Sequence, residues 1–361
     1  MRALFSACLV VIFFSMSTAQ NPQEEFCGKV NEGKALKAVS TIGFGSCANQ
    51  NAPYPVLNKI VERNPDVFCW LGDNIYGDSQ SMKVLREKYT KLGCHEEFRK
   101  LNEEAYFLAT WDDHDFGKND GGKFYTKKKR SKELFLEFWN EAQDSERRNH
   151  KGIYHTTTVG PEGQRVQFIM LDTRTFRDPL RLNIGGHLFK IKKKWKNDYI
   201  PIKSKSATFL GKEQWSWLEG VLNEPADVRI VMSSNQFGIS YNGYEAWANM
   251  PRERERFIEI IKKTKANGIV FISGDVHWAE ISKLKAEGCY PLYDITSSGI
   301  TQEWSHIEPN DNRIGEAFAP NNAGIIKIDW EQNDPLLQFK IIDVNGEEVR
   351  KHEVRLSELQ F

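Results

Sequence analysis

Short apolar runs, each followed by polar residues, constrain the fold of this chain more than any other feature. Seven of them have the length and composition of buried β-strands, and helical patterns lie between them. The predicted strands are 39–45, 66–71, 106–111, 166–171, 228–232, 269–273 and 290–296, and the predicted helices are 53–64, 79–101, 127–144, 212–222 and 251–266. This alternation predicts an α/β fold in which helices flank sheets.

The C-terminal part of the chain changes to a strand-rich pattern. Strands are predicted at 325–330 and 336–344, and Asn345-Gly346 is a typical hairpin turn before a further strand at 349–356. We expect this C-terminal β-hairpin, at about 336–356, to complete a sheet. Residues 20–361 are then one domain, with a Lys-rich insertion at about 181–206. The insertion is either a solvated loop or a basic rim for an anionic substrate.

The first residues have the pattern of a secretory signal peptide, which we place at 1–19. Arg2 precedes an apolar run at 3–14, and the small residues of 17–19 suit a cleavage site. The run is shorter than the roughly 20 residues that span a bilayer, and no later segment approaches that length. We therefore expect export to a periplasmic, extracellular or cell-surface location, with no transmembrane segment after cleavage.

Charge and cysteine content limit the partners and the redox chemistry. The chain has 49 Lys and Arg residues and 49 Asp and Glu residues, so no overall electrostatic field favours binding to nucleic acid. We also expect a monomer. Of six cysteines, Cys8 lies in the signal segment, so at least one of the other five stays unpaired. Cys47 is the natural candidate. The pairing among the others stays open: Cys27, Cys69, Cys94 and Cys289.

Polar side chains, most of them possible metal ligands, follow most of the predicted strands. In α/β sheets ligands bind beyond the carboxyl ends of strands, so one crevice can collect these residues. They are Cys47, Asp73, Tyr76, Asp112, Asp113, His114, Asp172, Arg174, Asn235, Asp275 and His277. Clustered carboxylates repel one another unless cations are present. The mixture of thiolate, phenolate, imidazole and carboxylate suits a trivalent iron beside a divalent metal, with a carboxylate bridging the two.

Five ordered motifs in this part of the chain resemble those of the PhoD-like alkaline phosphatases. Residues 72–76 (GDNIY) resemble the GDxxY motif, which purple acid phosphatases share, and 110–115 (TWDDHD) with Asn119 resemble the WDDHE…N motif specific to the PhoD-like group. The segments 45–47, 171–174 with Arg177, and 273–277 also match in order and spacing. The resemblance implies a metallophosphoesterase-like fold, which is a four-layer α-β-β-α sandwich of two mixed sheets flanked by helices.

The resemblance also implies a role for each matching residue. Asp73 would bridge two metals, and Asp113 and Asp275 would bind the second of them. Asn235 is near the position of a further ligand. The iron side would be completed by Cys47, Tyr76 and His277. The implied cofactor is a dinuclear or multinuclear centre of iron(III) plus a divalent metal, for which calcium is expected.

The implied activity is hydrolysis of phosphomonoesters or phosphodiesters by attack of a metal-bound hydroxide. His114 would protonate the leaving oxygen, and Asn119, Arg174 and Arg177 would contact the phosphoester. Trp247 either lines the substrate pocket or packs in the core. The alternative reading is a non-catalytic metal-binding protein that keeps the fold.

Some residues have simpler readings, and the chain departs from the family in places. His114 could be a structural histidine, Arg174 could pair with Asp172 as scaffolding, and Asp112 could be structural.

Classical family members carry an N-terminal β-sandwich, for which Cys47 lies too near the predicted mature start. The bulky Trp278 after the last motif is expected to reshape the pocket.

Overall fold

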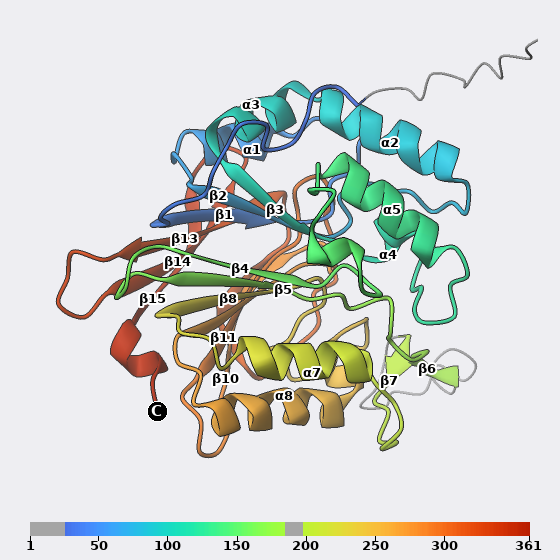
Figure 1. Ribbon diagram of the computed structural model, residues 1–361. Coiled ribbons are helices and arrows are strands. Elements are labelled where there is room, and N and C mark those ends of the chain that lie inside the picture. The colour runs from blue at the N-terminus through green and yellow to red at the C-terminus, as the bar shows by residue number, and fades with distance from the viewer. Residues whose placement is uncertain (1–25, 185–197) are drawn as a thin grey trace, which may run out of the picture.

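The computed structural model describes residues 26–184 and 198–361 (Figure 1). The predicted signal peptide and half of the Lys-rich insertion, residues 185–197, lie outside these described residues. Within them, no helix is both long enough and apolar enough to cross a membrane.

One sheet joins the N-terminal strands to the C-terminal hairpin. Its strand order is β15-β14-β13-β1-β2-β3, in which β1, β2 and β3 are parallel and the others pair antiparallel. The strands are β1 (Thr41–Gly45), β2 (Val67–Leu71), β3 (Tyr106–Thr110), β13 (Asn322–Asp329), β14 (Leu336–Asp343) and β15 (Glu348–Arg355). The predicted C-terminal hairpin is confirmed as β14 and β15, and it extends this sheet beside β13.

The second large sheet has the order β12-β10-β11-β9-β8-β5-β4. Its centre is parallel, from β5 through β8 and β9 to β11, and antiparallel strands lie at both edges. The strands are β4 (His155–Val159), β5 (Val166–Met170), β8 (Val228–Ser233), β9 (Ile269–Ser273), β10 (Ala279–Leu284), β11 (Leu292–Ser297) and β12 (Arg313–Phe318). A small separate sheet pairs β6 (Arg181–Leu182) with β7 (Tyr199–Ile200).

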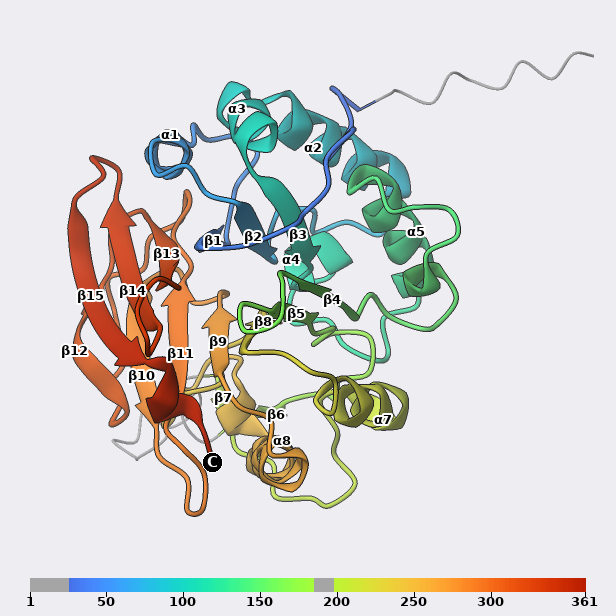
Figure 2. The ribbon, with the colours of Figure 1, turned by 60° about the vertical axis from the view of Figure 1, so that its left-hand side comes forward.

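Helices cover the outer faces of the two sheets (Figures 1 and 2). On the first sheet lie α1 (Pro55–Val61), α2 (Met82–Cys94), α3 (Glu96–Glu104) and α5 (Lys128–Phe138), and on the second lie α7 (Gly211–Val221) and α8 (Pro251–Thr264). The short helices are α4 (Asp113–Phe116), Glu146–Arg148, Trp247–Asn249 and Leu356–Leu359. The prediction of one helix over 79–101 is wrong, because His95 takes an extended backbone (ψ 133°) between α2 and α3.

The two sheets pack face to face around a shared apolar core. Phe44 of β1 and Phe168 of β5 belong to one buried cluster, which also takes in Trp215 of α7. A second cluster lies between the first sheet and its helices, where Trp70 of β2 meets Phe98 of α3. The predicted four-layer α-β-β-α sandwich is therefore confirmed.

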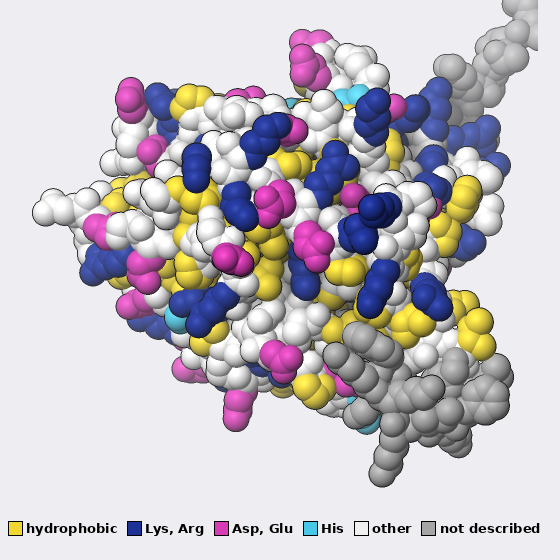
Figure 3. Space-filling view, turned by 90° about the horizontal axis from the view of Figure 1, so that it is seen from below, with side chains coloured by type: hydrophobic (Ala, Val, Ile, Leu, Met, Phe, Trp, Pro, Cys, Tyr) yellow, Lys and Arg dark blue, Asp and Glu magenta, His cyan; other side chains and the backbone are white. Residues whose placement is uncertain are grey.

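The outer face formed by α7 and α8 carries charges of both signs (Figure 3). Lys262 pairs with Glu259 on the same helix, and Lys263 pairs with Glu219 across to α7. The interspersed charges agree with the zero net charge and leave this face without a single-sign field.

The structure answers the question of cysteine pairing within the described residues. Cys27 forms a disulfide with Cys94 at the end of α2. Cys47, Cys69 and Cys289 are free. Cys47 thus keeps the thiol that a metal ligand needs.

Candidate metal centre

Asp73 lies at the meeting point of two groups of metal-ligand side chains. In one group its carboxylate is joined by Cys47 and His277, and in the other by Asp112, Asp113 and Asp275. A further combination, of Asp73 and Asp113 with His114, overlaps the second group. Within each group the ligand atoms lie within 4.8 Å of one another. One carboxylate that belongs to both groups has the position that a bridging ligand between two metals requires.

The softer donors gather on one side of Asp73. The Cys47 thiol lies 3.5 Å from Asp73 Oδ2, and the Tyr76 hydroxyl lies 3.0 Å from His277 Nε2. Ser298 supports both ends of this group, since its hydroxyl lies 3.1 Å from Cys47 Sγ and accepts the His277 backbone N–H at 2.9 Å. Thiol, phenol, imidazole and carboxylate therefore converge on one point.

The backbone is strained where the ligands occur. Cys47, Asp73, Asp275 and His277 have φ angles of 61°, 50°, 76° and 64°, in the left-handed region that residues with a Cβ rarely adopt. Such strain concentrates at functional sites, where the surrounding structure enforces it. Gly72, with φ of 99°, precedes Asp73, and a Cβ there would lie 2.6 Å from the Cβ of Asp112. The glycine thus lets the ends of β2 and β3 approach each other.

The metal-free cluster buries more carboxyls than the Arg174 guanidinium can neutralise, which is electrostatically unfavourable. Burial, the Cys47 thiol and neighbouring carboxyls raise the pKa of Asp73 well above its usual range, and burial with Asp112 does the same for the pKa of Asp275. Burial raises the pKa of Cys47 to about 12. A bound cation relieves this cost, because it favours the ionised form of every ligand.

Buried polar atoms that lack a hydrogen-bond partner among the described residues also indicate a cation site. Asn235 is fully buried, yet neither atom of its side-chain amide has a hydrogen-bond partner among the described residues. Asp112 Oδ2 and Asp113 Oδ1 are also buried without a hydrogen-bond partner in residues 26–184 and 198–361. Because buried polar groups are normally satisfied, these atoms fit ligands of a cation. The donor set therefore fits the metal centre that the sequence predicts.

His114 lies beside the cluster with one face toward solvent. Its Nδ1 lies 2.7 Å from Asp78 Oδ1, its ring packs on Tyr76 at 4.3 Å between centroids, and its Nε2 lies 4.0 Å from Asp73 Oδ2. Although burial lowers it, the Asp78 hydrogen bond and the nearby carboxylates raise the pKa of His114 above its ordinary value. The side chain is 16% exposed, so it can exchange a proton with a bound molecule or solvent.

The two predicted arginines are held behind the cluster. Arg174 is fully buried and pairs with Asp112 and with Glu245, each at 2.5 Å, and Arg177 pairs with Glu245 at 2.7 Å. Asp172 Oδ1 accepts the backbone N–H of Arg174 at 2.9 Å, whereas the guanidinium pairs with Asp112 and Glu245 and not with Asp172 as the scaffolding alternative assumed. In this arrangement Glu245 stands between both guanidinium groups and the pocket, and neither arginine is among the lining residues.

A pocket of about 330 Å³ opens onto the cluster. Asn119, Asp275 and His277 line it, which places the exposed Asn119 beside predicted ligands. Trp247 does not line it. That residue is fully buried, its indole N–H donates to Ser233 Oγ at 3.0 Å, and it stacks on Phe209 at 4.4 Å. Of the two alternatives for Trp247, the substrate-pocket reading is wrong and packing is correct.

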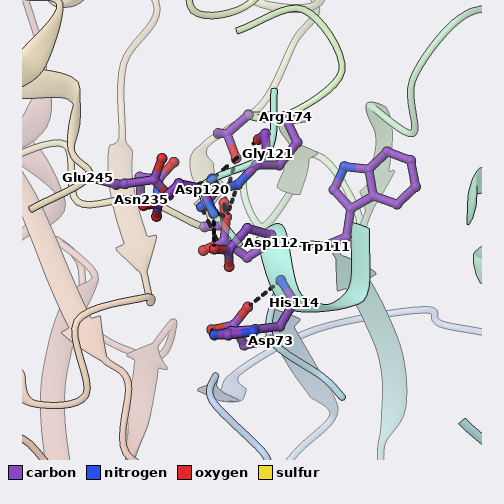
Figure 4. A network of polar contacts seen from close by, with 12 residues as sticks. Asp73, Trp111, Asp112, His114, Asp120, Gly121, Arg174, Asn235 and Glu245 are labelled. Atoms are coloured by element: carbon purple, nitrogen blue, oxygen red, sulfur yellow. Dashed lines mark hydrogen bonds and ion pairs between the residues drawn. The ribbon is translucent and has the colours of Figure 1, made fainter. Parts of the chain in front are cut away.

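Sequence reasoning missed Asp120 and Glu245, which form a further group with Asp113 (Figure 4). The Asp120 backbone N–H donates to Asp113 Oδ2 at 2.6 Å, which fixes the orientation of that carboxylate. Asp120 directly follows the motif residue Asn119, and that adjacency was its only signal in the sequence. Glu245 lies in an irregular loop after β8 and matches no motif, so nothing in the sequence marked it.

Comparison with known proteins yields one curated relative and several structures. Alkaline phosphatase D of Bacillus subtilis is 24% identical over 298 residues, which cover 72% of this chain and 48% of that protein. The chain thus spans about half the length of the curated relative it matches.

Two solved structures share the fold. The structure of PhoD matches with a TM-score of 0.62 and 18% identity over 88% of this chain and 72% of that one. GAP50, described as the anchor in the inner membrane complex of Plasmodium, matches with a TM-score of 0.54 and 12% identity over 88% and 89%. Residues 42–305, which hold every motif described above, match the PhoD-like phosphatase family. The chain therefore belongs to the PhoD-like phosphatase family.

Proposed function

We propose that this protein is a metal-dependent phosphoesterase that hydrolyses phosphomonoesters, phosphodiesters or both. The observation that carries the proposal is that the Asp73 carboxylate belongs to both ligand groups and that His114 lies beside it. A bridging carboxylate and an adjacent histidine are the parts that hydrolysis at a two-metal site needs. The family and the curated relative support the same activity.

The ligand types support a particular pair of metals. Cys47, Tyr76 and His277 would complete the coordination of an iron(III) ion with Asp73, because thiolate, phenolate and imidazole favour a transition metal. Asp73, Asp113, Asp275 and Asn235 offer only oxygen or amide donors, which suit calcium. Bound ions of this kind lower the pKa of coordinated water and neutralise charge on a phosphoryl group.

The residues of the chain supply the remaining chemistry. His114 donates a proton to the oxygen of the departing alcohol, and Asp78 holds the ring by its Nδ1 so that Nε2 faces the cluster. Asn119 lies in the pocket as a donor for a phosphoryl oxygen. Glu245 pairs with both Arg174 and Arg177, and Arg174 places its positive charge beside Asp112 and Asp113, on the side of the cluster away from the pocket.

Export is part of the proposal. The pattern at 1–19 is typical of a signal peptide. The Cys27–Cys94 disulfide supports it, because disulfides persist in oxidising compartments.

The alternative is a non-catalytic protein that keeps the fold and binds metal. The fold also occurs in GAP50, whose description as an anchor shows that fold alone does not decide activity. In this chain His114 and its Asp78 partner favour the enzyme. Neither is needed to hold the Cys47–Asp73–His277 group.

The proposal predicts hydrolysis by the metal-loaded protein. Protein loaded with iron and calcium is expected to cleave p-nitrophenyl phosphate, bis(p-nitrophenyl) phosphate or both, with kcat of about 1–1,000 s⁻¹. Chelation should remove the activity, and adding both metals back should restore it. A protein that holds both metals but cleaves neither ester, nor any alkyl phosphate, would establish the non-catalytic alternative instead.

A further inference from the structure

Aromatic side chains form one wall of the pocket that opens onto the metal-ligand cluster. Tyr199, Tyr244, Trp278 and Trp304 all line it, together with Asp275 and His277. Single exposed aromatic residues are common on protein surfaces, but a group of them inside one pocket marks a binding site. A phosphoester at the cluster would direct its alcohol portion into this space.

Trp304 is the most accessible member of the wall. It is 42% exposed, and its backbone N–H donates to the carbonyl of His277 at 3.0 Å, which holds it next to a candidate ligand. The ring centroids of Trp304 and Tyr244 lie 6.2 Å apart, and the two ring planes are nearly perpendicular, at 88°. Among the described residues no ring stacks face to face on Trp304, since its ring contacts are the perpendicular one with Tyr244 and a tilted one with His306 at 6.2 Å and 58°.

The wall also offers a directed polar group. Trp278 is 1% exposed, and its indole nitrogen has no hydrogen-bond partner among the described residues. The ring centroids of Tyr244 and Trp278 lie 6.2 Å apart, with an angle of 64° between the ring planes. Tyr244 therefore connects Trp278 and Trp304 into one aromatic surface. A buried indole N–H normally finds a partner, so a ligand that carries an acceptor would satisfy it.

We infer that the alcohol portion of the substrate carries a planar ring, such as an aryl group or a nucleobase, which stacks on Trp304 and accepts a hydrogen bond from Trp278. This inference rests on the proposed phosphoesterase function and names the class of its substrate. A saturated alcohol or polyol lacks the π-face that this wall recognises.

Two matched pairs of substrates test the inference, because each pair releases a similar primary alcohol. The pairs are adenosine 5′-monophosphate with ribose 5-phosphate, and 2-phenylethyl phosphate with 2-cyclohexylethyl phosphate. Wild-type protein is expected to prefer the planar member of at least one pair by roughly tenfold in kcat/KM. Preference in both pairs indicates any planar ring, and preference in the first pair alone indicates a nucleobase.

Variants at position 304 assign the preference to the indole. Trp304→Leu is expected to reduce it to about twofold or less, and Trp304→Phe to retain most of it, because leucine keeps apolar bulk without a π-face. Phe361→Ala is the control, since Phe361 is 44% exposed but lies at the C-terminus against Tyr290. Equal efficiency within both pairs, or an unchanged preference in Trp304→Leu, overturns the inference alone. Failure to hydrolyse all four monoesters, in metal-loaded protein that also cleaves neither p-nitrophenyl ester, overturns the proposed function as well.

Discussion

Replacing Asp73 with asparagine is expected to remove metal and activity together. The substitution takes a negative charge from the one residue that belongs to both ligand groups. We expect both metals to fall well below one per chain and kcat to fall at least about a thousandfold. Elemental analysis and an ester assay on the same preparation measure the two effects.

We expect the Asp73→Asn protein to keep its fold, so a loss of metal or activity would not result from unfolding. Asn tolerates the left-handed backbone that Asp73 adopts, with φ of 50°. Burial and neighbouring carboxyls raise the pKa of Asp73 well above its usual range, so the metal-free protein loses no favourable interaction with the charge. The metal-free variant is therefore expected to melt at or above the temperature of the metal-free wild type.

Asp66→Asn is the matched control for this experiment. Asp66 precedes β2, whereas Asp73 follows it, and its carboxylate accepts two backbone N–H groups at the opposite end of the strand. We expect Asp66→Asn to keep its metal. If Asp73→Asn kept both metals and wild-type turnover, Asp73 would not be the bridging ligand.

Replacing His114 with alanine is expected to separate metal binding from turnover. His114 can reach one ion together with Asp73 and Asp113, but each of the two main ligand groups is complete without it, so metal content should stay near the wild-type level. Hydrolysis of an alkyl phosphate should slow by about 100- to 10,000-fold, because a poor leaving group needs a proton. A p-nitrophenyl ester should be affected far less, since nitrophenolate leaves without one.

The chain offers a close control for this histidine. His95 packs on Tyr54 at 4.3 Å and 34°, the same geometry that His114 has on Tyr76. His95→Ala removes an equivalent packing contact outside the ligand groups and should leave the ratio of alkyl to nitrophenyl rates unchanged. Equal slowing of both esters by His114→Ala would show that the residue has a structural role only.

The sequence predicted the strands well, since burial on both faces leaves continuous apolar runs. The run at 269–273 matches β9, and the other six predicted core strands agree to within about two residues at each end. The edge strands β12 and β4 carry partly exposed residues and were missed, because they lack that apolar pattern. The strand β10 was also missed, since Glu280, Ser282 and Lys283 interrupt its apolar residues. The break at His95 was also missed, since neither proline nor an Asn-Gly pair marks it.

The candidate site was predictable where its residues directly follow strands. Cys47, Asp73 and Asp275 come within two residues of β1, β2 and β9, so the sheet edge brings them together. Ser298 contacts Cys47 across 251 positions of sequence, and Glu245 comes from an irregular loop. Such contacts depend on tertiary packing and leave no local pattern.

The burial of Trp247 could not be decided from sequence for a similar reason. A tryptophan near the start of a helix suits either a pocket or a core. Its contacts with Phe209, Phe237 and Phe257 arise from three separate elements, which only the folded chain brings together.

The central claim is that Asp73 joins two metals into one hydrolytic centre, and metal content tests it most directly. The measurement is elemental analysis of protein secreted from a native-like host and purified without chelator. We predict iron near one per chain together with a second metal, for which the oxygen-rich group favours calcium. Protein that contains no metal, and takes up none when incubated with iron and calcium, would contradict the account.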